Sequence, residues 1–328
     1  MIPKRQHFIP RLHLQHFAGS QPKGQLWTYD AIAAKAWSAI PAETAVQTHF
    51  YSAEKSDGTM DTRIEAFLSE VEGRAAPVYQ DLLRGIIPKN SQARVDFAQF
   101  LALMYVRTPA MRRMAAEIHG REVQIRNYAY ASDDRAFEAL TRRVEQEKGA
   151  LIDPQVKERI YKAMCEPTGY EVIVPKEQTL HALAASDKLA PILFKMKWCL
   201  VFADHGFFIT SDNPLVREVD PKTRHPIYGD HGFLNKTAEV TFPLSPRVVL
   251  LLSWNEKARE HGILERPHVD FVNRIRAAQS DRYLYAHVHH KRVEQLATEF
   301  KHSRPNMTTE GFGPRKFAPI KVSRRSSK

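Results

Sequence analysis

The chain has few cysteines and no long apolar run, and each lack excludes a class of protein. Its 328 residues include two cysteines, Cys165 and Cys199, which lack metal-ligand spacing, so neither a disulfide framework nor a cysteine-based zinc site is expected. The longest apolar run, residues 248–252, is far shorter than the roughly 20 residues that cross a bilayer. No glycine-rich nucleotide fingerprint is present, so no organic cofactor is expected.

The first residues are basic and interrupted, which argues against a secretory signal. Charges, His7 and Pro10 break every candidate for the apolar stretch of about 7–15 residues that a signal peptide needs. With the low cysteine content, this predicts a protein of the reducing cytoplasm that does not bind membranes.

The chain is strongly basic. It carries 48 Lys and Arg against 37 Asp and Glu, a formal net charge of +11. Such a charge raises the local concentration of polyanions, so nucleic acid or nucleotide is the expected partner. Many basic proteins bind no anion specifically, and the charge by itself leaves that alternative open.

The order of hydrophobic patterns predicts an α+β fold, in which a helical middle section packs with a mostly antiparallel sheet built from N-terminal and C-terminal strands. We expect a single domain over residues 1–315, with a helical insertion at about 62–195, followed by a basic disordered tail at 316–328. Pro109 should end or kink a helix, because proline lacks the backbone donor.

Several strands can be placed from aromatic and β-branched runs bounded by turn residues. Short strands are predicted at residues 26–29, 48–51 and 283–286. Two strand pairs are also predicted, a hairpin of 198–202 with 207–210, turning at 204–206, and a second pair of 238–242 with 248–254.

His7, beside Lys4 and Arg5, is the first candidate for chemistry. An imidazole can act as a general base, a metal ligand or a phosphate partner near neutral pH. Alternation along a strand places Arg5 and His7 on one face. The alternative is a histidine that bonds to the backbone and anchors the N-terminus.

Asp212 and Asn213 follow an apolar strand, where a metal ligand or an acid–base group is often found. Ser, Asp, Asn and Pro also build turns through side-chain bonds to the backbone, so a scaffold role is the alternative.

Helical positions supply three further candidates. Glu65 and Glu72 are seven residues apart and share one side of a helix, where two carboxylates can bind a divalent cation with a third ligand. Solvated carboxylates neutralised by nearby arginines are the alternative. Arg107, just before Pro109, could grip a phosphate or carboxylate bidentately, and a structural ion pair is the simpler alternative.

In order along the chain, several short motifs resemble the domain of unknown function 4238 family. They are Arg5-Gln6-His7-Phe8-Ile9-Pro10, Trp27-Thr28-Tyr29-Asp30, Arg107-Thr108-Pro109, the segment 208–214, the segment 242–246 and Arg282-Tyr283-Leu284-Tyr285-Ala286. The resemblance covers residues 4–286 and implies no chemistry, because the family has no established activity. It does favour motif positions such as His7, Arg107 and Asp212 as site residues.

Together these features predict a metal-assisted nuclease that hydrolyses RNA or DNA, as a toxin or defence effector. Asp212 with Glu65 or Glu72 would hold Mg²⁺ or Mn²⁺, and His7 would move a proton. Arg107 would stabilise charge on the phosphate, with Asn213 beside it, and Lys4 and Arg5 would bind the backbone of the substrate. The alternative is a non-enzymatic protein that binds a nucleotide or nucleic acid.

Overall fold

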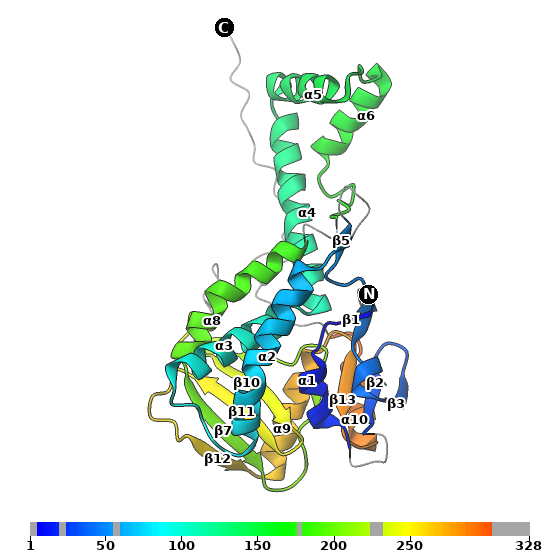
Figure 1. Cartoon of the computed structure of the whole chain (residues 1–328). Helices are drawn as coiled ribbons and strands as arrows, with labels where there is room; N and C mark the ends of the chain where they lie inside the picture. The colour runs from blue at the N-terminus through cyan, green and yellow to red at the C-terminus, as the bar shows by residue number, and fades with distance from the viewer. Residues whose placement is uncertain (1–4, 20–23, 55–59, 176–178, 224–231, 304–328) are drawn as a thin grey trace.

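The computed structural model describes residues 5–19, 24–54, 60–175, 179–223 and 232–303. The fold is α+β, as predicted: helices follow the N-terminal strands, and mostly antiparallel sheets follow the helices. Lys4 and the predicted tail, residues 316–328, lie outside the described residues. Figure 1 shows a body that contains the sheets and an arm of helices that projects from it.

The larger sheet consists of strands from the C-terminal half, in the order β12-β7-β11-β10-β9. Antiparallel pairing of β10 and β11 confirms the second predicted strand pair, whereas β12 joins β7 in parallel. The strands are β7 (Lys197–Ala203), β9 (Val216–Glu218), β10 (Glu239–Ser245), β11 (Val248–Ser253) and β12 (His261–Leu264).

The smaller sheet has the order β3-β2-β13-β8 and joins the two ends of the chain, which confirms a sheet of N-terminal and C-terminal strands. Its strands are β2 (Leu26–Asp30), β3 (Lys35–Ala39), β8 (Thr210–Ser211) and β13 (Tyr283–Ala286).

The predicted hairpin of residues 198–202 and 207–210 is wrong, because β7 and β8 lie in different sheets. After the turn, Phe208 and Ile209 are buried, and the Ile209 amide donates to the Asn273 side chain at 3.0 Å. The next two residues, Thr210 and Ser211, then pair with β13 and not with β7.

Two short strand pairs complete the N-terminal part: β1 (Arg5–His7) with β4 (Val46–Thr48), and β5 (Ala53–Glu54) with β6 (Met60–Asp61). The strand predicted at 48–51 is confirmed only at Thr48, since Phe50 and Tyr51 leave the strand and enter the core. Short helical turns lie at α1 (Arg11–Leu14), η1 (Gln15–Phe17), η2 (Pro41–Glu43), η3 (His181–Ala184), η4 (Pro221–Thr223) and η5 (Gly232–Leu234).

The main core lies between the larger sheet and the helices α2 (Arg63–Leu83), α3 (Ser91–Val106) and α8 (Ala185–Lys195) (Figure 1). From Phe97 onward α3 is buried on nearly all sides, which is why its sequence is apolar around its circumference rather than along one stripe. On the smaller sheet, α10 (Lys291–Glu299) packs over Tyr29 and Leu284, while α9 (Arg266–Ala278) lies beside β8.

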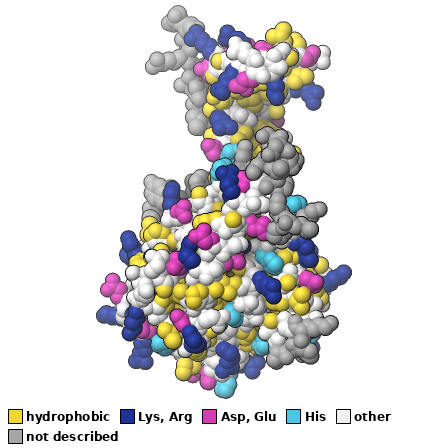
Figure 2. Space-filling model, viewed as in Figure 1, with side chains coloured by type: hydrophobic (Ala, Val, Ile, Leu, Met, Phe, Trp, Pro, Cys, Tyr) yellow, Lys and Arg dark blue, Asp and Glu magenta, His cyan; other side chains and the backbone are white. Residues whose placement is uncertain are grey.

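The arm consists of α4 (Pro109–Ala131), α5 (Asp134–Lys148) and α6 (Pro154–Cys165). As predicted, the helix before Pro109 ends, and Pro109 becomes the first residue of α4, capped by the Thr108 side chain. Residues 109–175 contain eleven acidic and eleven basic residues, and Figure 2 shows the two signs intermixed on the arm. The excess positive charge of the chain therefore comes from other segments.

No helix in the described part of the chain is both long and apolar enough to span a membrane.

Candidate functional site

Side chains from four separate segments gather around β1, and we call them the N-terminal cluster: Gln6, His7, Tyr51, Glu65, Glu72 and Arg107. Four of these, His7, Glu65, Glu72 and Arg107, are predicted site residues. Strand alternation sends the side chains of Gln6 and His7 to opposite faces of β1, so the cluster has two sides.

Arg107 is the buried centre of one side. It is 3% exposed and donates from Nη1 to the Glu72 carboxylate at 2.6 Å, from Nε to the Tyr51 hydroxyl at 3.0 Å and from Nη2 to the His7 carbonyl at 2.8 Å. Burial alone would lower the pKa of Arg107, but Tyr51 and Glu72 outweigh it and hold the pKa above its ordinary value. A guanidinium so enclosed fixes β1 in place, as in the ion-pair alternative, and its predicted role towards a phosphate stays a prediction.

Gln6 organises the other side. It is 2% exposed, its carbonyl oxygen accepts from the Tyr51 amide at 2.6 Å, and its amide group donates to Ser52 Oγ at 2.6 Å and to Glu65 Oε2 at 2.9 Å. Glu65 is thereby held against the N-terminal strand. The sequence pattern indicates His7 and not Gln6 as a site residue, because a glutamine side chain does not ionise near neutral pH and so is not a candidate acid or base.

The imidazole of His7 is held at one nitrogen. Its Nε2 lies 3.2 Å from the Pro41 carbonyl and donates to it, which places the hydrogen on Nε2. The imidazole also has a backbone hydrogen bond to Ala42, the residue after Pro41, and no side chain in the described ranges bonds to Nδ1. Burial lowers the pKa of His7 below its ordinary value, and the charge of Arg107 lowers it further, against the backbone bonds to Pro41 and Ala42 and the charge of Glu72, which raise it. The lowered pKa favours the neutral ring, and with the hydrogen on Nε2 the lone pair of that ring is on Nδ1.

Asp212 lies outside the N-terminal cluster and holds the segment that leads into β13. We call Asp212 and Asn213 the Asp212 anchor. Asp212 is 2% exposed, and its carboxylate accepts from the backbone amides of Asp281, Arg282 and Tyr283 at 2.7–2.8 Å. Burial raises the pKa of Asp212 to about 7, although the three amide donors lower it. Both carboxylate oxygens are thus used to fix the start of β13, as in the scaffold alternative. A catalytic role for Asp212 stays a prediction.

Asn213 belongs to the same anchor. Its side-chain amide donates to the Gln279 carbonyl at 3.0 Å, and its backbone amide and carbonyl both bond to the Ser211 hydroxyl. These bonds form the turn that the Ser-Asp-Asn-Pro composition predicts. The catalytic role predicted for Asn213 is untested by this geometry.

The predicted metal ligands do not fit one ion. Glu65 and Glu72 are two helical turns apart, about 10.5 Å along α2, and each carboxylate already accepts a side-chain donor. Both oxygens of Asp212 hold backbone amides. Over the described ranges, no three His, Cys, Asp or Glu side chains are grouped so that they could hold a metal.

One buried histidine was not singled out from the sequence. His13 is fully buried, and its Nε2 lies 2.8 Å from Thr210 Oγ1. Nδ1 lies 3.0 Å from the Tyr79 hydroxyl, which itself donates to the Leu244 carbonyl, so the hydrogen is on Nδ1. Burial holds the pKa of His13 well below its ordinary value. The ring joins α1, α2 and β8 and has no free position for chemistry.

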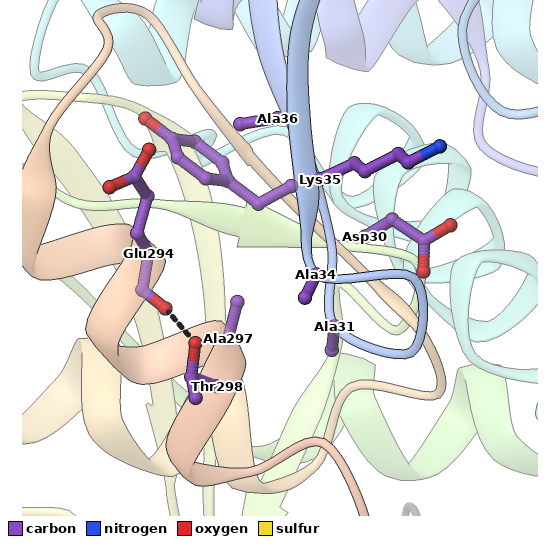
Figure 3. A pocket seen from close by; sticks show the side chains of 9 residues that line it. Asp30, Ala31, Ala34, Lys35, Ala36, Glu294, Ala297 and Thr298 are labelled. Atoms are coloured by element: carbon purple, nitrogen blue, oxygen red, sulfur yellow. Dashed lines mark hydrogen bonds between the residues drawn. The ribbon is translucent and has the colours of Figure 1, made fainter.

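A pocket of about 270 Å³ lies apart from these residues, between the β2–β3 hairpin and α10 (Figure 3). Ala31, Ala34, Ala36 and Ala297 contribute methyl groups to its lining, and Glu294 contributes a carboxylate. That carboxylate is paired with His289 at 2.7 Å. None of the predicted site residues lines it.

Comparison with known proteins identifies a family for the chain but no activity. One family model, described as a protein of unknown function (DUF4238), matches residues 5–290. No curated protein and no solved structure matches the chain.

Proposed function

Because the chain belongs to the DUF4238 family of proteins of unknown function, its chemistry has to be argued from its own side chains, and we propose that it is a nuclease that hydrolyses phosphodiester bonds in RNA or DNA. One observation carries the proposal: the Pro41 carbonyl holds His7 at Nε2, which leaves the lone pair of the neutral ring, the form that burial favours, on Nδ1. A base oriented through its second nitrogen is the usual arrangement of a general base.

In the proposed reaction, Nδ1 of His7 takes a proton from the attacking hydroxyl, that of water or of a ribose. The oxygen forms a bond to phosphorus, the bond to the leaving oxygen breaks, and that oxygen takes a proton from solvent. Arg107 is a positioning residue, since it bonds to the His7 carbonyl and favours the neutral ring. Arg5, exposed on β1, is proposed to contact phosphates.

We propose no binding site for a divalent ion such as Mg²⁺ or Mn²⁺, and the cleavage assay therefore tests whether the reaction requires one. Because Glu65, Glu72 and Asp212 do not fit a single ion, the steps above use side chains alone. An ion brought by the substrate would neutralise the charge on the phosphate.

The test is cleavage of labelled single-stranded RNA, transfer RNA and DNA by purified protein in Mg²⁺, Mn²⁺ or EDTA. His7→Ala should lower the rate on the order of a hundredfold to ten-thousandfold, the usual contribution of a general base. His205→Ala is the matched control, because His205 has a 78% exposed side chain and lies outside the N-terminal cluster. Equal rates for His7→Ala and wild type would overturn the assignment, and no cleavage of any substrate would overturn the proposal.

The second candidate is a protein that binds a nucleotide or nucleic acid without cutting it, and the net charge favours it equally. Thermal melting with a nucleotide panel separates the two. A ligand that binds only the folded state stabilises it by roughly 2.7 kcal/mol at a hundredfold excess over its Kd. Stabilisation that EDTA does not change, without cleavage, would favour the binding protein.

A nuclease of this kind would act in the cytoplasm as a toxin or defence effector. Induced expression of wild type and His7→Ala in a bacterial host tests that proposal: growth arrest by wild type alone is expected, and equal growth would contradict it.

A further inference from the structure

A tryptophan is exposed on the face of the smaller sheet that α10 does not cover. Trp37 of β3 is 42% exposed. In the sheet register it lies opposite Thr28, two residues from Lys35, which lies opposite Asp30, so Trp37, Lys35 and Asp30 share a face. Figure 3 shows the side chains of Asp30 and Lys35 pointing away from Glu294 of α10.

A second ring extends this face. β13 places Tyr283 opposite Asp30, on the other side of β2 from Lys35. The rings of Trp37 and Tyr283 meet edge to face, with centroids 6.4 Å apart. Because Tyr283 is half-buried and packs against Trp37, the tryptophan is held against the sheet while much of its side chain stays accessible to solvent.

Two cationic side chains, Arg282 and Lys35, lie on the same face as the two rings. The Arg282 guanidinium lies 5.0 Å from the centre of the Tyr283 ring, and its side chain is 43% exposed. It is also paired with Asp30 at 2.6 Å, which holds it over the ring. Lys35 is exposed at the next position on the same face as Trp37. An exposed ring flanked by cations is the composition by which proteins bind unpaired bases and their phosphates.

We propose that Trp37, Tyr283, Lys35 and Arg282, the aromatic platform, bind single-stranded nucleic acid by stacking a base on Trp37. A single strand is favoured because a duplex offers no free base face for stacking. This inference deepens the nuclease proposal, on which it rests for the fate of the strand, although binding itself requires no cleavage.

The platform is connected to His7 through the chain. β3 ends at Ala39, two residues after Trp37, and the chain then enters η2, where the Pro41 carbonyl accepts from His7. The four peptide units that separate Trp37 from Pro41 span at most about 14 Å. One strand of a few nucleotides could therefore contact both the aromatic platform and the imidazole.

The experiment measures binding of labelled single-stranded RNA, single-stranded DNA and duplex DNA by fluorescence anisotropy, at several salt concentrations. All variants carry His7→Ala so that cleavage does not interfere. Trp37→Ala should weaken single-strand binding on the order of tenfold to a hundredfold, because one stacked base contributes about 1–3 kcal/mol. Trp37→Phe keeps a ring and should recover most of the affinity. Phe271→Ala, which removes a 61% exposed ring from α9, is the matched control.

The outcomes separate this inference from the nuclease proposal. Loss of affinity in Trp37→Ala but not in Phe271→Ala supports the platform, whether or not wild type cuts the strand. Equal affinity of those two variants overturns it, and so does tighter binding of duplex than of single strands. Failure to bind any nucleic acid also overturns it.

Discussion

The N-terminal cluster and the Asp212 anchor both contain ionisable residues at family motif positions, but they differ in how many polar atoms of those residues have hydrogen-bond partners. At the anchor, three backbone amides occupy both oxygens of a buried carboxylate. In the cluster, Arg107 is equally enclosed, but its neighbour His7 keeps a ring nitrogen, Nδ1, to which no described side chain bonds. A motif residue whose polar atoms are all used maintains the fold, whereas one with an atom left over can do chemistry.

The largest expected effect on stability is at the anchor. Asp212→Ala leaves three backbone N–H groups near the start of β13 without their acceptor, and each buried unsatisfied donor costs about 1–3 kcal/mol. We expect a loss of about 3–5 kcal/mol in the free energy of unfolding, measured by urea denaturation. Asp204→Ala, at a 54% exposed side chain, is the control and should change little. A wild-type unfolding curve for Asp212→Ala would contradict the scaffold role.

Arg107 should come next. Arg107→Met removes the charge that pairs with Glu72 and the donors to Tyr51 and the His7 carbonyl. Breaking a buried pair costs about 3–5 kcal/mol, and because Glu72 is 25% exposed we expect about 2–3 kcal/mol here. Cleavage per folded molecule should also fall, since β1 is released. Were stability lost and the rate per folded molecule kept, Arg107 would hold the fold without positioning His7.

Histidine titration predicts a smaller effect that depends on pH. The folded-state pKa of His13 lies well below its ordinary value because of burial, so the unfolded chain takes up a proton first as the pH falls. The contribution of His13 to stability should be complete above about pH 6.5 and decline below it, by up to about 1.4 kcal/mol per pH unit. Unfolding curves at several pH values test this. His13→Gln should flatten the decline in part, and an unchanged decline would exclude His13 as its source.

The smallest effect on stability is expected at His7. The ring is half-buried and makes hydrogen bonds only to the backbone of Pro41 and Ala42 among the described residues, so His7→Ala should cost about 1–2 kcal/mol. A loss as large as that of Asp212→Ala would mean that His7 too is a scaffold residue.

Much of the fold follows from local pattern. Pro109 ends one helix and begins the next, and β10 and β11 pair as their apolar runs predict. The crossing from β7 to β8 could not be predicted, because the turn at residues 204–206 looks like a hairpin turn. The path after the turn is held by contacts that are distant in sequence, among them the bond from the Ile209 amide to Asn273, 64 residues away.

The candidate site could be predicted in its residue types but not in its bonds. Separate motifs predict His7, Glu72 and Arg107, and only the fold brings strand β1, helix α2 and the end of α3 together. Asp212 looks the same in sequence whether it holds a metal or three amides, since its partners are about 70 residues distant. Gln6 and Tyr51 carry no pattern that distinguishes a hub from an ordinary polar residue.

The central claim is that His7 is the general base of the proposed reaction while Asp212 stabilises the fold, and one measurement tests it directly. The cleavage rate of single-stranded RNA, divided by the folded fraction from the same sample, should be compared for wild type, His7→Ala and Asp212→Asn. The account predicts a rate per folded molecule that falls on the order of a hundredfold or more in His7→Ala and stays near wild type in Asp212→Asn. The reverse, an active His7→Ala beside a folded but inactive Asp212→Asn, would contradict it.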